Sequence, residues 1–576
     1  MPEEIHISHL TIKIEGTPLS GEAISSLDEV VVDHSLHLPS MFTLRLFSAD
    51  MHWLEDDTFR EGKKVEIQAG EPPVSILTGK IAAIEPELSQ DLPRLVVRGY
   101  DLSHKLYRGK RRRAFNNVTD SDLARQLAQE SGLRAAVDDS PGAPHEYVYQ
   151  NNQTNAEFLL ARARRLGFEL FVENDTLNFR RPPAGGEAVR LAWGEALLEF
   201  RARLSTSEQV NEVEVRGWDL RKKKSVVGHA IHGIGSPQIG IDQPGAIVAK
   251  RAWGEAKIAI IDQFVRSPSE ADVLAQSALD ELSSSFVEAD GTCEGNPAVK
   301  PGKLVEIAGV GRRFNGKYYV TSVIHEWNLT NGLRSHFTIS GRRDNGIWSL
   351  LEETASASQP ILGLMIGIVT NNQDPEGLMR VRLCIPNLSD VDESAWARLV
   401  TPMAGNGRGF MFIPEIDDEV IVGFEHGDVH RPYVLGALWN GKDAPPIAQS
   451  AALSGGAVNK RVIKSRAGHT ITLDDTAGGE EITIVDKTGS NKIVLHSPDN
   501  SMQIKVQGDL TIESLGKITL KAATGLDMSS DTSLSMKGLS GSIEGTTSLT
   551  IKDGAGAQIA LSGPSVNVNN GALEVI

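Results

Sequence analysis

The sequence predicts a mainly β protein with a few helices, which ends in an intertwined trimeric β-helix, or β-prism. Gly occurs 55 times among the 576 residues, and aromatic residues make up only 5%. Short runs of alternating apolar and polar residues are separated by Gly, Pro and Asp turns, a pattern typical of antiparallel strands. Residues 440–576 contain no Phe, Tyr or Trp. Because a single core rarely serves more than about 250–300 residues, we expect several domains.

The N-terminal part has two groups of strand-like runs with helices between them. The runs in residues 5–102 predict a small antiparallel barrel, and those from 304 to about 353 predict a second one. Residues 119–132 show helical spacing, with Asp120 or Ser121 as the expected N-cap. Residues 155–167 repeat this design. We therefore expect a first domain over 1–355 with two barrel-like subdomains and helices.

A small polar linker at 354–360 precedes a strand-rich block of about 80 residues. The Ala444–Pro446 segment closes this block. The sequence thus predicts a second domain over 360–445 and a third over 446–576.

The third region carries a repeat of apolar doublets, in which two aliphatic residues flank one other residue. From Leu510 through Ile518 and Leu526 to Leu534 the step is eight residues each time. A strand alternates its faces, so each doublet places two aliphatic side chains on one side. One chain has nothing to cover that side, whereas three identical chains around a shared axis enclose it. The expected trimer-core residues are Ile482, Ile484, Ile493, Leu495, Ile504, Val506, Leu510, Ile512, Ile518, Leu520, Leu526 and Met528. The alternative from the pattern alone is a single-chain solenoid.

Charge and composition exclude several classes of function. The net charge of -17 and the isoelectric point near 5.4 disfavour binding to nucleic acid or to an anionic membrane surface. The N-terminus lacks the basic and apolar regions of a secretory signal, so we expect synthesis and assembly in the cytoplasm. Cys293 and Cys384 are too few for a disulfide framework or a four-Cys zinc site.

The remaining motifs give no active site. The His229/His232 and His426/His430 pairs have the spacing of metal ligands but are expected to face solvent. The basic run at 108–113 could indicate nucleic-acid binding, yet in an acidic chain it favours a salt-bridge surface between chains or toward a tube. GxSxG, HExxH and C-x-x-C motifs do not occur. We expect no catalytic residue, no cofactor and no metal.

Three segments resemble known spike proteins. The residues GIVTNNQDPEGLMRVRLCIP and SAWARLVTPMAGNGRGFMFIPEIDDEVIVGFEHGDVHRPYVLGALWN, which cover most of 366–440, resemble the OB-fold neck of phage-tail and type VI spikes. VRGYDLSHKLYRGKRRR and NNQTNAEFLLARARRLGFELFVENDTLNF resemble the hub of the late-control-D or VgrG-like family. KSRAGHTITLDDTAGGEEITIVDKTGSNKI is similar to the family's transition from neck to β-helical needle.

The resemblance implies the central spike of a contractile, phage-tail-like injection system. Its hub, as a homotrimer, would join a hexameric inner tube and the baseplate, and its needle would carry a PAAR-like tip protein and possibly effector cargo. We expect Leu573, Val575 and Ile576 to form the tip-binding end. The target membrane would be contacted only transiently, and the particle is expected to be released to the extracellular space.

Two alternatives belong to other classes. A spike with cell-wall hydrolase activity would clear a band in zymography, and a receptor-binding tail fibre would bind a glycan array. Family members with enzymes carry extra domains beside the neck or after the needle, and we expect none here. The aromatic-free tail offers no stacking surface for sugars.

Overall fold

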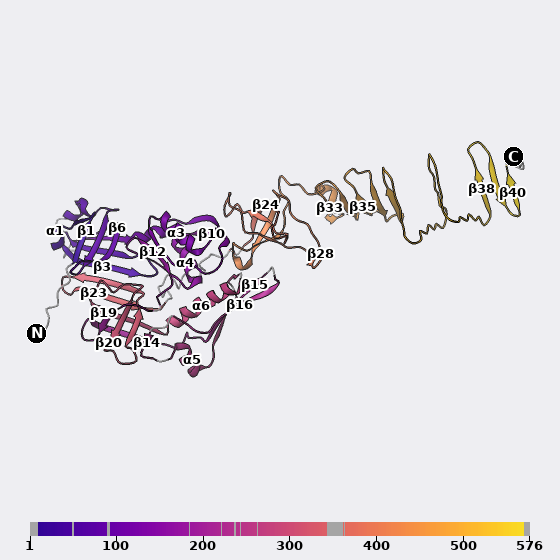
Figure 1. Cartoon of the computed structure of the whole chain (residues 1–576). Helices are drawn as coiled ribbons and strands as arrows, with labels where there is room; N and C mark the ends of the chain where they lie inside the picture. The colour runs from indigo at the N-terminus through magenta and orange to yellow at the C-terminus, as the bar shows by residue number, and fades with distance from the viewer. Residues whose placement is uncertain are drawn as a thin grey trace. The chain divides into compact units, whose positions relative to one another are not determined.

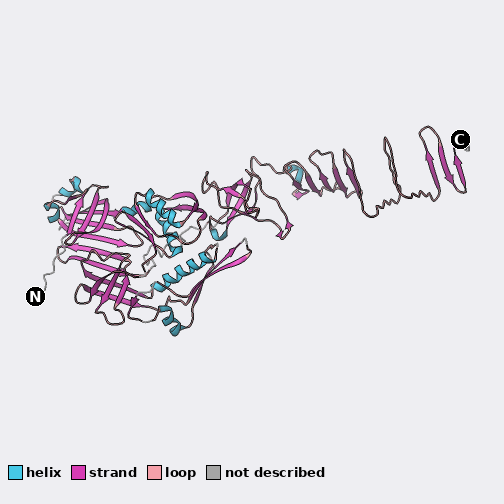
Figure 2. Ribbon diagram, viewed as in Figure 1, coloured by secondary structure: helices cyan, strands magenta, loops and turns pink. Residues whose placement is uncertain are grey.

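The computed structural model describes residues 10–48, 51–88, 93–183, 185–219, 222–234, 238–241, 243–261, 263–265, 267–341, 361 and 363–568. The chain divides into two compact units, Met1–Pro445 and Pro446–Ile576. Both units are built largely from strands (Figure 2). The predicted linker at 354–360 lies outside the described residues.

The first unit is organised around an antiparallel sheet to which eleven strands of its described residues belong (Figure 1). In spatial order the strands are β14 (Leu197–Leu204), β19 (Val287–Glu294), β23 (Gly332–Ile339), β22 (Ser322–Asn328), β3 (Leu27–Ser35), β4 (Met41–Phe47), β7 (Arg94–Asp101), β6 (Val74–Glu87), β5 (Lys64–Ala69), β1 (Leu10–Ile14) and β2 (Thr17–Pro18).

The two strand groups that the sequence predicts as separate barrels are joined in this one sheet. The joint is the antiparallel pairing of β3 with β22, in register from Glu29 opposite Asn328 to Ser35 opposite Ser322. Each group keeps its own core, one around Phe42 and the other around Tyr318. In the described part of residues 1–355, which is called the hub below, the two strand groups thus keep separate cores and share a hydrogen-bonded seam.

Two histidines lie at this seam, His325 buried and His34 partly buried. His34 of β3 and His325 of β22 are in edge contact, with ring centroids 5.9 Å apart. Burial lowers the pKa of His34 to about 4, and burial together with the charge of a protonated His34 lowers the pKa of His325 to about 3. Both imidazoles are therefore neutral at pH 7, and protonating either would place a charge in the seam.

The histidine pair predicts that acid weakens the hub. Because the folded pKa values lie below the unfolded value of about 6.5, the unfolded chain binds more protons once the pH falls below 6.5. The free energy of unfolding should fall from pH 6.5 to about 4, as measured by denaturant titration at fixed pH. His325→Gln should flatten this dependence, whereas His52→Gln, at a partly exposed position, should leave it unchanged. Equal pH profiles for wild type and His325→Gln would contradict the prediction.

In the order of the sequence, helices lie between the two groups of strands. The helix predicted at 119–132 is α3 (Asp120–Glu130), and the one predicted at 155–167 is α4 (Asn155–Leu166), which ends at Gly167 with φ 67°. The expected N-cap of α3 is corrected: Thr119 caps the helix and exchanges hydrogen bonds with Asp122 in a capping box.

Because Thr119 caps the helix, the Asp120 side chain makes contacts with other elements. Its carboxylate is buried, accepts a hydrogen bond from Arg162 of α4 and lies 3.0 Å from His145 Nε2. Burial alone would raise the pKa of Asp120, but the hydrogen bond from His145 and the charge of Arg162 outweigh it and lower the pKa to about 2. One carboxylate thus ties α3 to α4 and to the strand that carries His145.

Smaller sheets and helices complete the hub. The short helices are α1 (Gly21–Ser25) and α2 (His52–Glu55). Two of the small sheets are β8 (Arg111–Val118) with β10 (His145–Gln153), and β9 (Arg134–Val137) with β12 (Thr176–Arg180) and β11 (Glu169–Glu173). Two further sheets are β13 (Ala188–Ala192) with β20 (Leu304–Ala308), β21 (Gly316–Tyr319) and β17 (Gln238–Ile239), and β16 (Lys224–Ala230) with β15 (Glu212–Asp219) and β18 (Lys257–Ile260). The helices α5 (Gly245–Trp253) and α6 (Pro268–Ser284) follow, and α6 packs on β15 and β16 (Figure 1).

The block after residue 363 forms a small closed barrel. Its strand order is β25 (Arg382–Cys384), β24 (Met365–Asn371), β29 (Glu419–Phe424), β30 (Pro432–Ala437) and β26 (Arg398–Leu399). A bridge between Val381 and Ala397 brings the two outer strands together. The barrel interior holds Val369, Leu383, Val420 and Val422, which are fully buried. A short hairpin, β27 (Ala404–Gly405) with β28 (Arg408–Gly409), projects from it.

His430 connects this barrel to the hub, which corrects the expectation that it faces solvent. Its Nε2 accepts a hydrogen bond from the backbone N–H of Tyr149 at 2.8 Å. Its Nδ1 lies 2.6 Å from Asp428 Oδ1, so the carboxylate holds the proton on Nδ1 and leaves Nε2 free to accept. The Tyr149 hydroxyl also donates to the backbone oxygen of Leu388. Barrel and hub therefore meet through directed hydrogen bonds.

The second unit consists of short strands separated by turns. They are β31 (Leu453–Ser454), β32 (Ala457–Val458), β33 (Lys460–Lys464), β34 (Thr470–Asp474), β35 (Glu481–Val485), β36 (Lys492–His496), β37 (Ser501–Lys505), β38 (Ser548–Lys552), β39 (Gln558–Ser562) and β40 (Ser565–Val568), preceded by α8 (Gln449–Ala452). None of the helices in the described ranges is long and apolar enough to cross a membrane.

Candidate functional site

The strands β33–β37 form an antiparallel meander in which the apolar doublets stand opposite one another. One column runs through Ile471, Ile484, Ile493 and Ile504, each the direct partner of the next. A second column runs through Leu473, Ile482, Leu495 and Met502. Between them lies a column of Thr472, Thr483, Val494 and Gln503 that points to the other face. The meander therefore gathers its large aliphatic side chains on one side.

This aliphatic face, defined by the two columns, stays open within the chain. The exposed fraction is 42% for Ile482, 46% for Ile484, 43% for Leu495 and 52% for Ile504. Ile493 is half-buried. Fully burying one Ile or Leu side chain contributes about 1.5–3 kcal/mol. Covering this exposed row of side chains would therefore strongly favour association with another surface.

Residues 509–547 continue the repeat without strand pairing to other described residues of this chain. The doublets there are also exposed: 56% and 70% for Leu510 and Ile512, 51% and 65% for Ile518 and Leu520. Leu526 and Met528 are 58% and 57% exposed. Their backbone groups also lack the ladder that a sheet would supply, so this stretch is poised to pair with strands from outside the chain.

The doublet pattern resumes inside a sheet at β38–β40. In the backbone register, Leu549 is paired with Leu561, and Leu561 with Val566. Ile551 is likewise paired with Ile559, and Ile559 with Val568. The same two-column arrangement therefore flanks residues 509–547 on both sides.

The sequence interpretation named only part of this face. Ile463, Ile471, Leu473 and Met502 belong to the columns although they were not predicted as core residues. The Ile471-Thr472-Leu473 triplet carried the same apolar-x-apolar signal as the predicted doublets. Val506, the last predicted residue of its doublet, follows β37 and is 37% exposed. The tip residues Leu573, Val575 and Ile576 lie outside the described residues.

A cluster of Glu212, Glu214 and His229 in the hub has ligand atoms within 4.8 Å of one another. Its carboxylates already carry cationic partners, because Lys257 Nζ lies 2.5 Å from Glu212 and Arg216 pairs with Glu214. The geometry resembles a metal site, but the ion pairs compensate the charge that would attract a cation.

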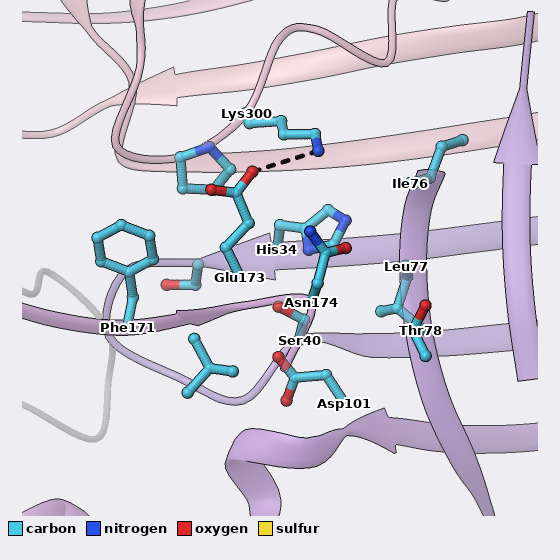
Figure 3. A pocket seen from close by; sticks show the side chains of 13 residues that line it. His34, Ser40, Ile76, Leu77, Thr78, Asp101, Phe171, Glu173, Asn174 and Lys300 are labelled. Atoms are coloured by element: carbon cyan, nitrogen blue, oxygen red, sulfur yellow. Dashed lines mark hydrogen bonds and ion pairs between the residues drawn. The ribbon is translucent and has the colours of Figure 1, made fainter. Parts of the chain in front are cut away.

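A cavity of about 40 Å³ with a mixed polar and apolar lining lies where β3, β6, β7 and β11 approach one another. Figure 3 shows Asp101, Ser40, Asn174 and His34 around it, with Lys300 paired to Glu173 at 3.4 Å. Burial raises the pKa of Asp101 to about 6 despite its hydrogen bonds from Ser103 and Ser40. This volume accommodates a few water molecules rather than a substrate.

Three family models match the chain. The Alg8 N-terminal domain matches residues 4–328, more than half of the chain. The type VI secretion system/phage-baseplate injector OB domain matches residues 365–439, which contain the closed barrel. The phage baseplate V C-terminal trimerisation domain matches residues 492–574, which contain most of the predicted core residues.

Two relatives carry the names of type VI secretion system spike proteins. VgrG5 of Pseudomonas aeruginosa, a type VI secretion system spike protein, is 21% identical over 83% of this chain and 59% of its own length. VgrG1b of the same organism is 34% identical over 21% of this chain and 15% of its own length. The chain belongs to the Alg8 N-terminal domain family. It resembles VgrG spike proteins and spans less than two thirds of the length of these two relatives.

Solved structures agree with this VgrG-like fold. A chain of the half-lidded Francisella PdpA–VgrG complex aligns with a TM-score of 0.51 and 8% identity, covering 87% of this chain and 88% of that one. The lidless form of the complex aligns with a TM-score of 0.50, covering 88% of this chain and 100% of that one. At this identity the likeness concerns the fold, and it agrees with the predicted mainly β class.

Proposed function

We propose that the chain is the structural central spike of a contractile, phage-tail-like injection system and acts as a homotrimer. The observation that carries this proposal is the aliphatic face, which is uncovered in one chain and continues into a stretch without internal strand pairing. The match of residues 492–574 to a trimerisation domain supports the same arrangement. Three copies around one axis would enclose the doublets in a dry aliphatic interior.

In this proposal each predicted domain has its own role. Residues 1–355 would form the hub that joins the hexameric inner tube and the baseplate, and 360–445 the OB-fold neck that keeps three chains in register. Residues 446–576 would form the needle that transmits force and carries a PAAR-like tip protein, with effector cargo attached to it. The names of the VgrG relatives and of the injector OB model support an injection system.

Catalysis is not part of this proposal. A relative named actin cross-linking toxin VgrG1, from Vibrio cholerae, is 26% identical over 24% of this chain, but the match covers only 13% of the toxin. The spike would be made in the cytoplasm and would work inside an assembled particle that is released to the extracellular space. Its contact with a target membrane would be brief and mechanical.

Solution mass tests the assembly directly. Light scattering after size exclusion should give three times the 62.3 kDa chain mass, with no change on dilution over about tenfold. Removing residues 509–576 should lower the mass to that of a single shortened chain. A stable full-length monomer would overturn the proposal.

A further inference from the structure

The basic run at 108–113 separates into two parts in the structure. Arg113 is used internally: it donates to both carboxylate oxygens of Glu130, at 3.1 and 2.9 Å, and to Gln150. Arg112 donates to the backbone oxygen of Asn387 at 3.3 Å. These two arginines fix the start of β8 against α3 and the closed barrel.

The other cationic side chains of the run make no such contacts. Arg108, Lys110 and Arg111 are exposed, and within the described part of the chain no ion pair or hydrogen bond of their side chains is found. They therefore present three positive charges in a chain whose net charge is -17. Unpaired cations kept together in an acidic chain point to an anionic partner.

Arg108 and Arg111 border a cleft of about 380 Å³. Lys105 lies on its wall with Nζ 3.1 Å from the backbone oxygen of Ser131. Glu130 is the carboxylate of the wall; it forms an ion pair with Arg113 and also lies within the electrostatic reach of Arg111. The lining residues are Lys105, Arg108, Arg111, Gln129, Glu130, Ser131, Gly132 and Asn155.

We propose that this basic cleft of the hub binds an acidic peptide segment of a partner protein. Arginine forks bind carboxylates through two parallel hydrogen bonds, and the Gln129 amide on the cleft wall can bond a peptide backbone. Arg113, two residues from Arg111 on β8, is itself held by the Glu130 carboxylate, so it does not compete for a ligand of the cleft. A nucleic acid fits less well, because the surrounding chain repels a long phosphate backbone. The inference adds a site to the hub and does not depend on trimer formation.

Fluorescence anisotropy with a labelled hexaglutamate peptide tests the inference on the full-length protein. The wild type should bind the peptide at low ionic strength and lose most of the binding at 0.5 M salt. Arg108→Glu combined with Arg111→Glu should weaken binding at least tenfold. The matched control is Arg312→Glu with Arg313→Glu, which places the same charge change on an exposed turn of the hub and should leave binding unchanged.

Two outcomes would overturn the assignment. Equal loss of binding in both double variants would mean that net charge rather than the cleft attracts the peptide. Tighter binding of a labelled oligothymidine than of hexaglutamate, lost in the cleft variant, would assign the cleft to nucleic acid instead. Circular dichroism of both variants distinguishes a lost site from a lost fold.

Discussion

Ile518→Asp should abolish trimer assembly of the needle. In the proposed trimer, Ile518 of each chain points to the shared axis, so the substitution brings three carboxylates into one dry layer. Each ionised carboxylate loses its hydration without gaining a cation, and the cost is several kcal/mol per group. Removing three Ile side chains forfeits about 1.5–3 kcal/mol each in addition. Light scattering should report a chain that no longer forms a stable trimer.

Thr519→Asp is the matched control for this experiment. Thr519 is the neighbour of Ile518 and, by strand alternation, points to the opposite face. An added carboxylate there stays hydrated, so the trimer yield should remain close to that of the wild type. Loss of the trimer in both variants would indicate a general sensitivity to charge, and a normal yield from Ile518→Asp would refute the aliphatic interior.

Asp120→Ala should produce the largest loss of hub stability among single polar substitutions. Removing this carboxylate leaves Arg162 and His145 without their shared partner in a buried site. Breaking a buried pair in this way costs about 3–5 kcal/mol, because the remaining charge stays desolvated. Denaturant titration of the hub transition measures the change. Asp122→Ala on the same helix removes the side-chain half of the capping box and an exposed ion pair with Arg125, and should cost only about 1 kcal/mol.

The Asp120 site also predicts a pH window. Its folded pKa of about 2 lies below the unfolded value near 3.9, so the stabilisation is complete above about pH 4 and is lost as the pH falls toward 2. Asp120→Asn should remove that part of the acid sensitivity while the histidine effect between pH 6.5 and 4 remains. An unchanged profile below pH 4 would contradict the assignment.

Local features of the fold follow well from the sequence. The helices α3 and α4 and the doublet strands were predicted from spacing, because a 3.6-residue or two-residue period is visible in the chain itself. The N-cap of α3 was wrong by one residue because Thr, Asp and Ser all cap helices and only geometry selects among them. The missed Ile471 and Leu473 carried the same apolar-x-apolar pattern as the predicted doublets, so the signal for them was present in the sequence.

Contacts between residues that are far apart in the sequence could not be predicted from spacing. The β3–β22 seam joins residues almost 300 positions apart, and no periodicity encodes such a partner. The pairing of His430 with the Tyr149 backbone is equally distant in sequence. A histidine in a turn-rich segment normally meets solvent, and only the folded chain supplies the buried N–H that it accepts. The trimer-core residues remain a prediction, which the exposed columns motivate.

The unpaired stretch at 509–547 affects how quickly the spike can mature. If its hydrogen bonds come from other copies, a newly made chain cannot finish folding alone, however stable its hub. Completion then depends on encounters between chains, so maturation should accelerate steeply with concentration and stall in dilute lysate. Cells that make the protein would benefit from synthesising many copies close together, for example from neighbouring ribosomes on one message.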